Sequence, residues 1–215
     1  MQLLCLECDA TYDELPGSCA CTCGGLLDVK HDAFRLPAGW QDRPLGVWRY
    51  KELLPDPGIA PVSLGEGGTR LLDAPRLAKQ LGIRSLQLKI EADNPTGSFK
   101  DRGMTCALSW AVGRGARTVG CASTGNTAAS MAAYAARAGI DAVVLLPAGH
   151  VAPGKVAQSI AHGARILEVE GNFDDAMACV ADLAAEGHLF LLNSKNPLRL
   201  EGQKTLMYEI LDQRD

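Results

Sequence analysis

The alternation of short apolar runs with helix-forming stretches constrains this chain most. Apolar runs of five or six residues lie at 118–122, 142–147, 165–170 and 189–193, and stretches of helical pattern at 127–139, 153–163 and 173–187 separate them. Strands that alternate with helices in this way pair in parallel through right-handed crossovers. Gly139, Gly163 and Gly187 follow the predicted helices, where positive φ is favoured. The sequence therefore predicts an α/β fold with an open parallel sheet flanked by helices.

The pattern also extends to both sides of this region. We expect 86–92 to be a further strand of the same sheet, preceded by a short helix at 77–81, and 200–213 to be a final helix. Residues 1–30 form a Cys-rich head, and 31–60 a connector rich in Pro, Trp and Asp, with a short helical piece between its prolines. The predicted organisation is thus a head, a connector and an α/β region at 61–215.

Bulk composition excludes several functions. With 215 residues, 47% of them hydrophobic, the chain can bury a substantial core. A net charge of -4 without a basic tract argues against nucleic acid or an anionic membrane as partner. The sequence shows no signal peptide and no membrane span, so we expect a cytoplasmic protein. It does not determine the oligomeric state, and a homodimer is one alternative.

The segment "NPTGSFKDRG" at 94–103 contains a lysine where a helix should begin. Ser98 and Asp101 have the spacing of a capping box, which places Lys100 in the first helical turn. The unpaired N–H groups there favour a neutral amine over an ammonium ion. A neutral lysine is a nucleophile and forms Schiff bases. The alternative is a solvated lysine whose charge Asp101 offsets.

Two other strand ends carry polar motifs. "STGNTA" at 123–128 offers hydroxyls, an amide and backbone N–H groups at a helix N-terminus, which suits a carboxylate or phosphate. "NSKNPLRLEGQKT" at 193–205 adds amides, a hydroxyl and Arg199, which suits a second anion. His150 and Lys155 could line an entrance. Ligands of open α/β sheets bind at the carboxyl ends of strands, so the three motifs together favour a catalytic cleft.

The head has the cysteine spacing of a zinc site. Cys5, Cys8, Cys21 and Cys23 form the most regular ligand set, and Cys19 is a spare or an alternative fourth ligand. Four thiolates would make the zinc structural rather than catalytic. Because the CxC half is tighter than the usual ribbon spacing, a metal-free knuckle is the alternative.

These motifs, with "VWRYKELLP" and "CxCGGLLDV", resemble those of threonine synthase, a family of fold-type II pyridoxal-phosphate enzymes. The resemblance runs from Cys5 to the end of the chain and implies a tryptophan synthase beta-like fold with a zinc-ribbon-like head. It implies that Lys100 binds pyridoxal 5′-phosphate covalently, that Phe99 borders its ring and that Asn126 meets its 3′ oxygen. The implied substrate-binding residues are Ser123, Thr124 and Asn126 for a carboxylate, and Thr127, Asn193, Ser194 and Arg199 for a phosphate.

The resemblance implies conversion of O-phospho-L-homoserine and water to L-threonine and phosphate. Lys100 would move protons at Cα and Cβ. Members of the family continue well beyond residue 215, where a Gly-rich loop for the cofactor phosphate is expected, so we expect a truncated form with uncertain activity of its own. Cysteate synthase or another fold-type II lyase or dehydratase is an alternative. A non-catalytic zinc-binding module with an enzyme-like fold is an alternative of another class.

Overall fold

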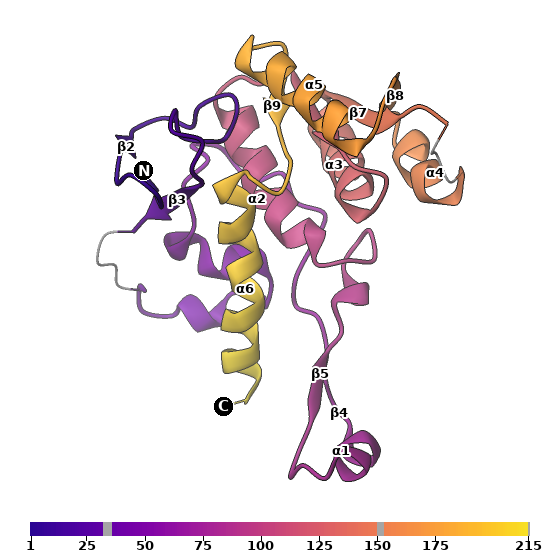
Figure 1. Ribbon diagram of the computed structural model, residues 1–215. Helices are drawn as coiled ribbons and strands as arrows, with labels where there is room; N and C mark the ends of the chain where they lie inside the picture. The colour runs from indigo at the N-terminus through magenta and orange to yellow at the C-terminus, as the bar shows by residue number, and fades with distance from the viewer. Residues whose placement is uncertain (32–35, 150–152, 215) are drawn as a thin grey trace.

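The protein is built around a four-stranded parallel sheet (Figure 1). The computed structural model describes residues 1–31, 36–149 and 153–214, without the side chains of 153–155. The strands of the sheet, in spatial order, are β8 (Arg165–Val169), β7 (Asp141–Pro147), β6 (Thr118–Ala122) and β9 (Phe190–Leu191). The helices are α1 (Pro75–Leu81), α2 (Lys100–Gly113), α3 (Asn126–Ala138), α4 (Pro153–Ala161), α5 (Phe173–Ala185) and α6 (Pro197–Arg214). The predicted parallel α/β sheet is therefore confirmed.

Helices cover both faces of the sheet because neighbouring strand residues point to opposite sides. Cys121 and Val144 pack in one hydrophobic cluster with residues of α3, whereas Ala122 and Leu145 pack in a second cluster with residues of α5. Gly139, Gly163 and Gly187 have φ of +70°, +81° and +80°, as expected after helix ends. Among the described residues, no helix is long and apolar enough to cross a membrane.

Helices α2 and α6 pack closely because small residues face each other. A Cβ added at Gly202 would lie 2.0 Å from the backbone oxygen of Arg102, and one at Gly103 would lie 2.5 Å from that of Arg199. Only glycine permits such a close approach of two helix backbones. This contact brings the beginning of α6 beside the beginning of α2, where Lys100 lies.

The N-terminal head is a small antiparallel sheet. Its strands β1 (Gln2–Cys5), β2 (Thr11–Tyr12) and β3 (Leu27–Lys30) have the order β2-β1-β3. Leu3 and Leu27 are buried in the same cluster as residues of α2 and α6, so the head packs on the main body. In the connector, 3₁₀ helices at Trp40–Asp42 and Val47–Leu53 confirm the predicted short helical piece.

The prediction that 86–92 belongs to the parallel sheet is wrong. β5 (Gln87–Lys89) pairs antiparallel with β4 (Leu71–Asp73), and with α1 the two strands form an arm that projects from the body (Figure 1). The physical reason is proximity in the sequence, because strands joined by a short connection pair at a small entropic cost. A strand-like pattern indicates a strand but not its partner.

Candidate active site

Lys100 is the first residue of α2, and its side chain is half-buried. Its Nζ lies 4.2 Å from the centroid of the Phe99 ring. Burial lowers the pKa of Lys100 below its usual value of 10.5, and the positive charge of Arg199 lowers the pKa further. Within the described part of the chain, no carboxylate opposes this shift. The structure therefore shifts the pKa of Lys100 in the direction of the neutral amine that the sequence predicts.

The predicted capping box at the start of α2 is wrong. Ser98 Oγ accepts a hydrogen bond from the backbone N–H of Lys100 at 3.3 Å, not from that of Asp101. The Asp101 carboxylate is fully buried and accepts from the backbone N–H of Thr96 at 2.7 Å. In a capping box, the backbone N–H of Ser98 would donate to Asp101. Here the loop before Lys100 turns back, so the backbone N–H of Thr96 donates instead. Asp101 therefore holds that loop rather than capping the helix.

The loop between β6 and α3 presents an uncapped helix N-terminus. Gly125 precedes α3 in an extended conformation, with φ of -131° and ψ of -148°, and no side chain caps the first turn. Ser123 Oγ accepts from the backbone N–H of Gly125 at 3.2 Å, while Asn126 is exposed. Free backbone N–H groups at such a terminus attract an anion. Ser123, Thr124 and Asn126 lie at this terminus, and their binding of a carboxylate stays a prediction.

Arg199 adds a buried positive charge to this region. Its side chain is 1% exposed, donates to the backbone oxygen of Leu192 at 3.0 Å, and lies 3.4 Å from Thr127 Oγ1. Its Nε has no hydrogen-bond partner, and no carboxylate in the described ranges forms an ion pair with it. Burial lowers the pKa of Arg199 from its usual value. A buried guanidinium without an anion is costly, so its arrangement indicates an anionic ligand.

Asn193 has a structural role that the sequence does not reveal. Its Oδ1 accepts from the backbone N–H of Ala122 at 2.9 Å, and its Nδ2 donates to the backbone oxygen of Ala122 at 3.0 Å. The side chain thus extends the pairing of β9 with β6 and positions the loop after β6. Ser194 is exposed and lines a pocket of about 450 Å³ shared with the head. His150 and the side chain of Lys155 lie outside the described residues. Phosphate contacts of Asn193 and Ser194 stay predictions.

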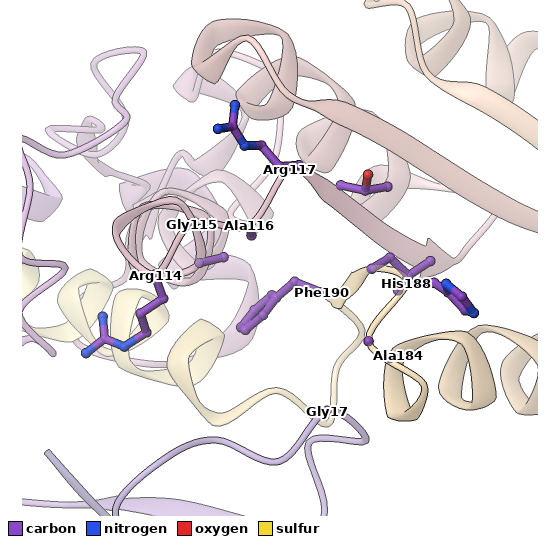
Figure 2. A pocket seen from close by; sticks show the side chains of 12 residues that line it. Gly17, Arg114, Gly115, Ala116, Arg117, Ala184, His188 and Phe190 are labelled. Atoms are coloured by element: carbon purple, nitrogen blue, oxygen red, sulfur yellow. The ribbon is translucent and has the colours of Figure 1, made fainter.

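The pocket in Figure 2 lies at the amino ends of strands β6 and β9, away from the candidate site. It has a volume of about 420 Å³, and its lining includes Thr118, at the beginning of β6, and Phe190, at the beginning of β9. Its polar side chains do not converge, because Arg114, Arg117 and His188 point in different directions (Figure 2). The predicted site residues lie at the other ends of these strands, so we assign no reaction to this pocket.

A buried polar network that the sequence motifs do not reveal lies behind Lys100. The Arg102 guanidinium bonds both oxygens of Glu209, at 2.7 and 2.8 Å, and both oxygens of Glu91, at 2.7 and 2.8 Å. Glu209 also accepts from the backbone N–H of Gly68 at 2.8 Å, which ties a Gly-rich loop to α6. The sequence could have indicated this network, because Thr205 and Glu209 lie on the same face of the predicted helix as the small residue Gly202.

The four predicted metal ligands of the head come together. The Sγ atoms of Cys5, Cys8, Cys21 and Cys23 all lie within 4.8 Å of one another. The Cys5–Cys23 and Cys8–Cys21 sulfur distances are both 3.6 Å. Cys19 is buried elsewhere, with its Sγ 3.6 Å from the backbone oxygen of Leu191. The described geometry thus contains the predicted four-thiol cluster and leaves Cys19 outside it.

Comparison with known proteins agrees with the fold. The sequence profile described as "Pyridoxal-phosphate dependent enzyme" matches residues 62–215. The chain belongs to the family of pyridoxal-phosphate dependent enzymes. Among curated relatives, the threonine synthase of Methanosarcina acetivorans is 51% identical over 99% of this chain and 53% of that protein. The threonine synthase of Methanocaldococcus jannaschii is 51% identical over 97% of this chain and 53% of that protein.

A solved structure supports the same family. The processed form of threonine deaminase isoform 2 from Solanum lycopersicum is 26% identical and superposes with a TM-score of 0.60, covering 67% of this chain and 42% of that one. This chain spans about half the length of the curated relatives it matches, with 53% coverage of the two named above. The shared fold therefore extends over about two thirds of this chain.

Proposed function

We propose that this chain carries the catalytic residues of a threonine synthase, which converts O-phospho-L-homoserine and water to L-threonine and phosphate. The observation that carries the proposal is the buried Arg199, a cation with no carboxylate partner among the described residues, whose charge acts on Lys100. A substrate with a phosphate group would supply the missing anion. The names of the curated relatives support the same reaction.

The residues around Lys100 fit pyridoxal 5′-phosphate. A half-buried amine with a lowered pKa is suited to hold the cofactor covalently, with Phe99 and Asn126 bordering it. When bound, the cofactor supplies an electron sink for the negative charge that develops at the substrate Cα. Partial burial of Lys100 lowers the pKa of its amine, which favours proton uptake and release by the amine during the reaction.

The remaining side chains would bind and orient the substrate. Arg199 and Thr127 bind the phosphate, with Asn193 and Ser194 beside them, while Ser123, Thr124 and Asn126 hold the carboxylate at the N-terminus of α3. Lys100 removes protons at Cα and Cβ as phosphate leaves Cγ. A proton then adds at Cγ, water adds its hydroxyl at Cβ and gives its proton to the released phosphate, and a proton adds at Cα to complete L-threonine.

Two measurements test this function. Treatment with pyridoxal phosphate and borohydride, followed by peptide mass spectrometry, should place a pyridoxyl group on Lys100. Lys79, on the exposed side of α1, is the matched control, since Lys79→Ala should still be modified at Lys100 while Lys100→Ala should not. Phosphate release from O-phospho-L-homoserine should follow the same pattern. Modification of another lysine in place of Lys100 would refute the proposal.

Analysis of the reaction products distinguishes the proposed substrate from the alternative one. Threonine from O-phospho-L-homoserine supports the proposed function, whereas cysteate from phosphoserine and sulfite would assign the chain to cysteate synthase. The cytoplasmic location and the homodimer stay predictions.

We also propose that the head binds one structural zinc ion in a zinc-ribbon-like arrangement. Tetrahedral coordination with Zn–S bonds of about 2.3 Å separates the sulfurs by about 3.8 Å, close to the distances within the cluster. Zinc analysis of protein made with zinc should give about one equivalent, and less than about a tenth would refute the site. Cys8→Ser should lose the zinc, and Cys19→Ser, the matched control outside the cluster, should keep it.

A further inference from the structure

The carboxylate of Asp101 joins two parts of the candidate site. Asp101 follows Lys100 directly in α2 and is 0% exposed. Its Oδ2 accepts from the backbone N–H of Thr96 at 2.7 Å, and its Oδ1 accepts from Thr96 Oγ1 at 2.6 Å and from Ser130 Oγ at 2.5 Å. Thr96 belongs to the loop before Lys100, whereas Ser130 lies one turn into α3. One side chain therefore connects the Lys100 turn with α3, whose uncapped N-terminus is the proposed place of the substrate carboxylate.

Packing alone does not explain this carboxylate. A buried charge without a cation is costly, and in the described part of the structure no lysine or arginine forms an ion pair with Asp101. Burial raises the pKa of Asp101, and three donors that converge on its two oxygens oppose that shift. An apolar residue of similar size would be cheaper to bury, so the hydrogen bonds themselves are the feature to be explained.

The same face of α3 also contacts a second buried carboxylate, that of Glu66. Tyr134 lies four residues after Ser130, and its hydroxyl donates to Glu66 at 2.6 Å. Glu66 is 3% exposed and belongs to the Gly-rich loop that also contacts α6 through Gly68. Helix α3 therefore attaches to both segments that surround the start of α2, and the Asp101–Ser130 bond is the attachment nearest to Lys100.

We propose that Asp101 is a positioning residue that, through Ser130, holds the amine of Lys100 in its half-buried place relative to the N-terminus of α3. The proposal rests on the proposed function, because it assigns Asp101 a task in the site built around Lys100. Asp101 does not touch substrate in this assignment. Its effect on the reaction passes through the position and the solvation of Lys100.

Loss of this attachment should change the chemistry of Lys100. If the turn at residues 96–100 separates from α3, water reaches the amine and the burial that lowers its pKa is reduced. Ser130→Ala removes one of the three donors and leaves the others in place. Asp101→Asn keeps the size of the side chain but replaces one accepting oxygen by an NH2 group, which cannot accept from Thr96 or Ser130. It should therefore raise the pKa of Lys100 more than Ser130→Ala does.

The experiment measures the protonation of Lys100 directly. The purified protein is methylated with formaldehyde and cyanoborohydride across a pH series, and peptide mass spectrometry follows Lys100 with the exposed Lys79 as internal reference. The matched control is Ser159→Ala, because Ser159 is a buried helical serine whose hydroxyl has no partner among the described residues. The midpoint of the pH profile reports the pKa of the amine, whereas the plateau reports access of the reagent.

Ser130→Ala should raise the midpoint for Lys100 by about half a unit or more, which lowers its reactivity at neutral pH about threefold relative to the plateau. Ser159→Ala should leave the midpoint unchanged. A lower melting temperature of Ser130→Ala with an unchanged midpoint would show a purely structural role and overturn the proposal. If Asp101→Asn does not fold, Ser130→Ala decides alone. Methylation needs no pyridoxal phosphate, so failure of the cofactor reaction at Lys100 is detected separately.

Discussion

Substitution of Gly202 by Ala tests the close contact between α2 and α6. The added Cβ would lie 2.0 Å from the backbone oxygen of Arg102 and 2.8 Å from its carbonyl carbon. Backbone atoms of a buried helix cannot rotate away, so the helices must separate by about 1 Å or more. Such overpacking costs about 3 kcal/mol, and the better helix propensity of alanine returns about 1 kcal/mol. We expect a net loss of about 2 kcal/mol.

For a chain of this size, that loss lowers the melting temperature by about 4–8 °C. Thermal unfolding followed by circular dichroism measures it. Met207→Ala is the matched control, because Met207 is 55% exposed on the same helix and should change the melting temperature little. If Gly202→Ala melts at or above the temperature of the unchanged protein, helix propensity outweighs packing and the close approach of α2 and α6 is refuted.

Two further predictions concern the buried carboxylates. Tyr134→Phe removes the hydroxyl that donates to Glu66 and should cost about 2 kcal/mol of unfolding free energy, whereas Tyr208→Phe, at a hydroxyl with no hydrogen bond among the described residues, should cost little. Equal losses of unfolding free energy in the two variants would contradict a stabilising role of the Tyr134–Glu66 hydrogen bond. Burial alone would raise the pKa of Glu209, but Arg102 outweighs burial and holds the pKa below its usual value of 4.5. Because the folded-state pKa is lowered, the stabilisation is complete above about pH 4.5 and is lost as the pH falls further. Melting temperatures measured from pH 7 to pH 3 should fall steeply at the acid end, and Glu209→Gln should flatten that fall.

The local sequence determined much of the candidate site. Lys100, the loop at 123–128 and Arg199 follow from patterns within a few residues, because helix starts and strand ends are encoded by their immediate neighbours. The four clustered cysteines were also identified from spacing alone, and the structure brings their sulfurs together. The roles of the individual substrate-binding residues and the domain boundaries stay predictions.

Only the tertiary structure decided the long-range partners. The strand pattern at 86–92 could not show that β5 pairs with β4, and the Ser98–Asp101 spacing could not show that Asp101 bonds Thr96 and Ser130 instead. Likewise, the sequence suggested that Arg199 binds an anion, but not that packing of α6 on α2 buries it without a carboxylate partner in the described residues. Local patterns determine which elements form, because they depend on propensity and periodicity. Partners of buried polar groups depend on how those elements pack, since a hydrogen bond forms only where two distant segments meet.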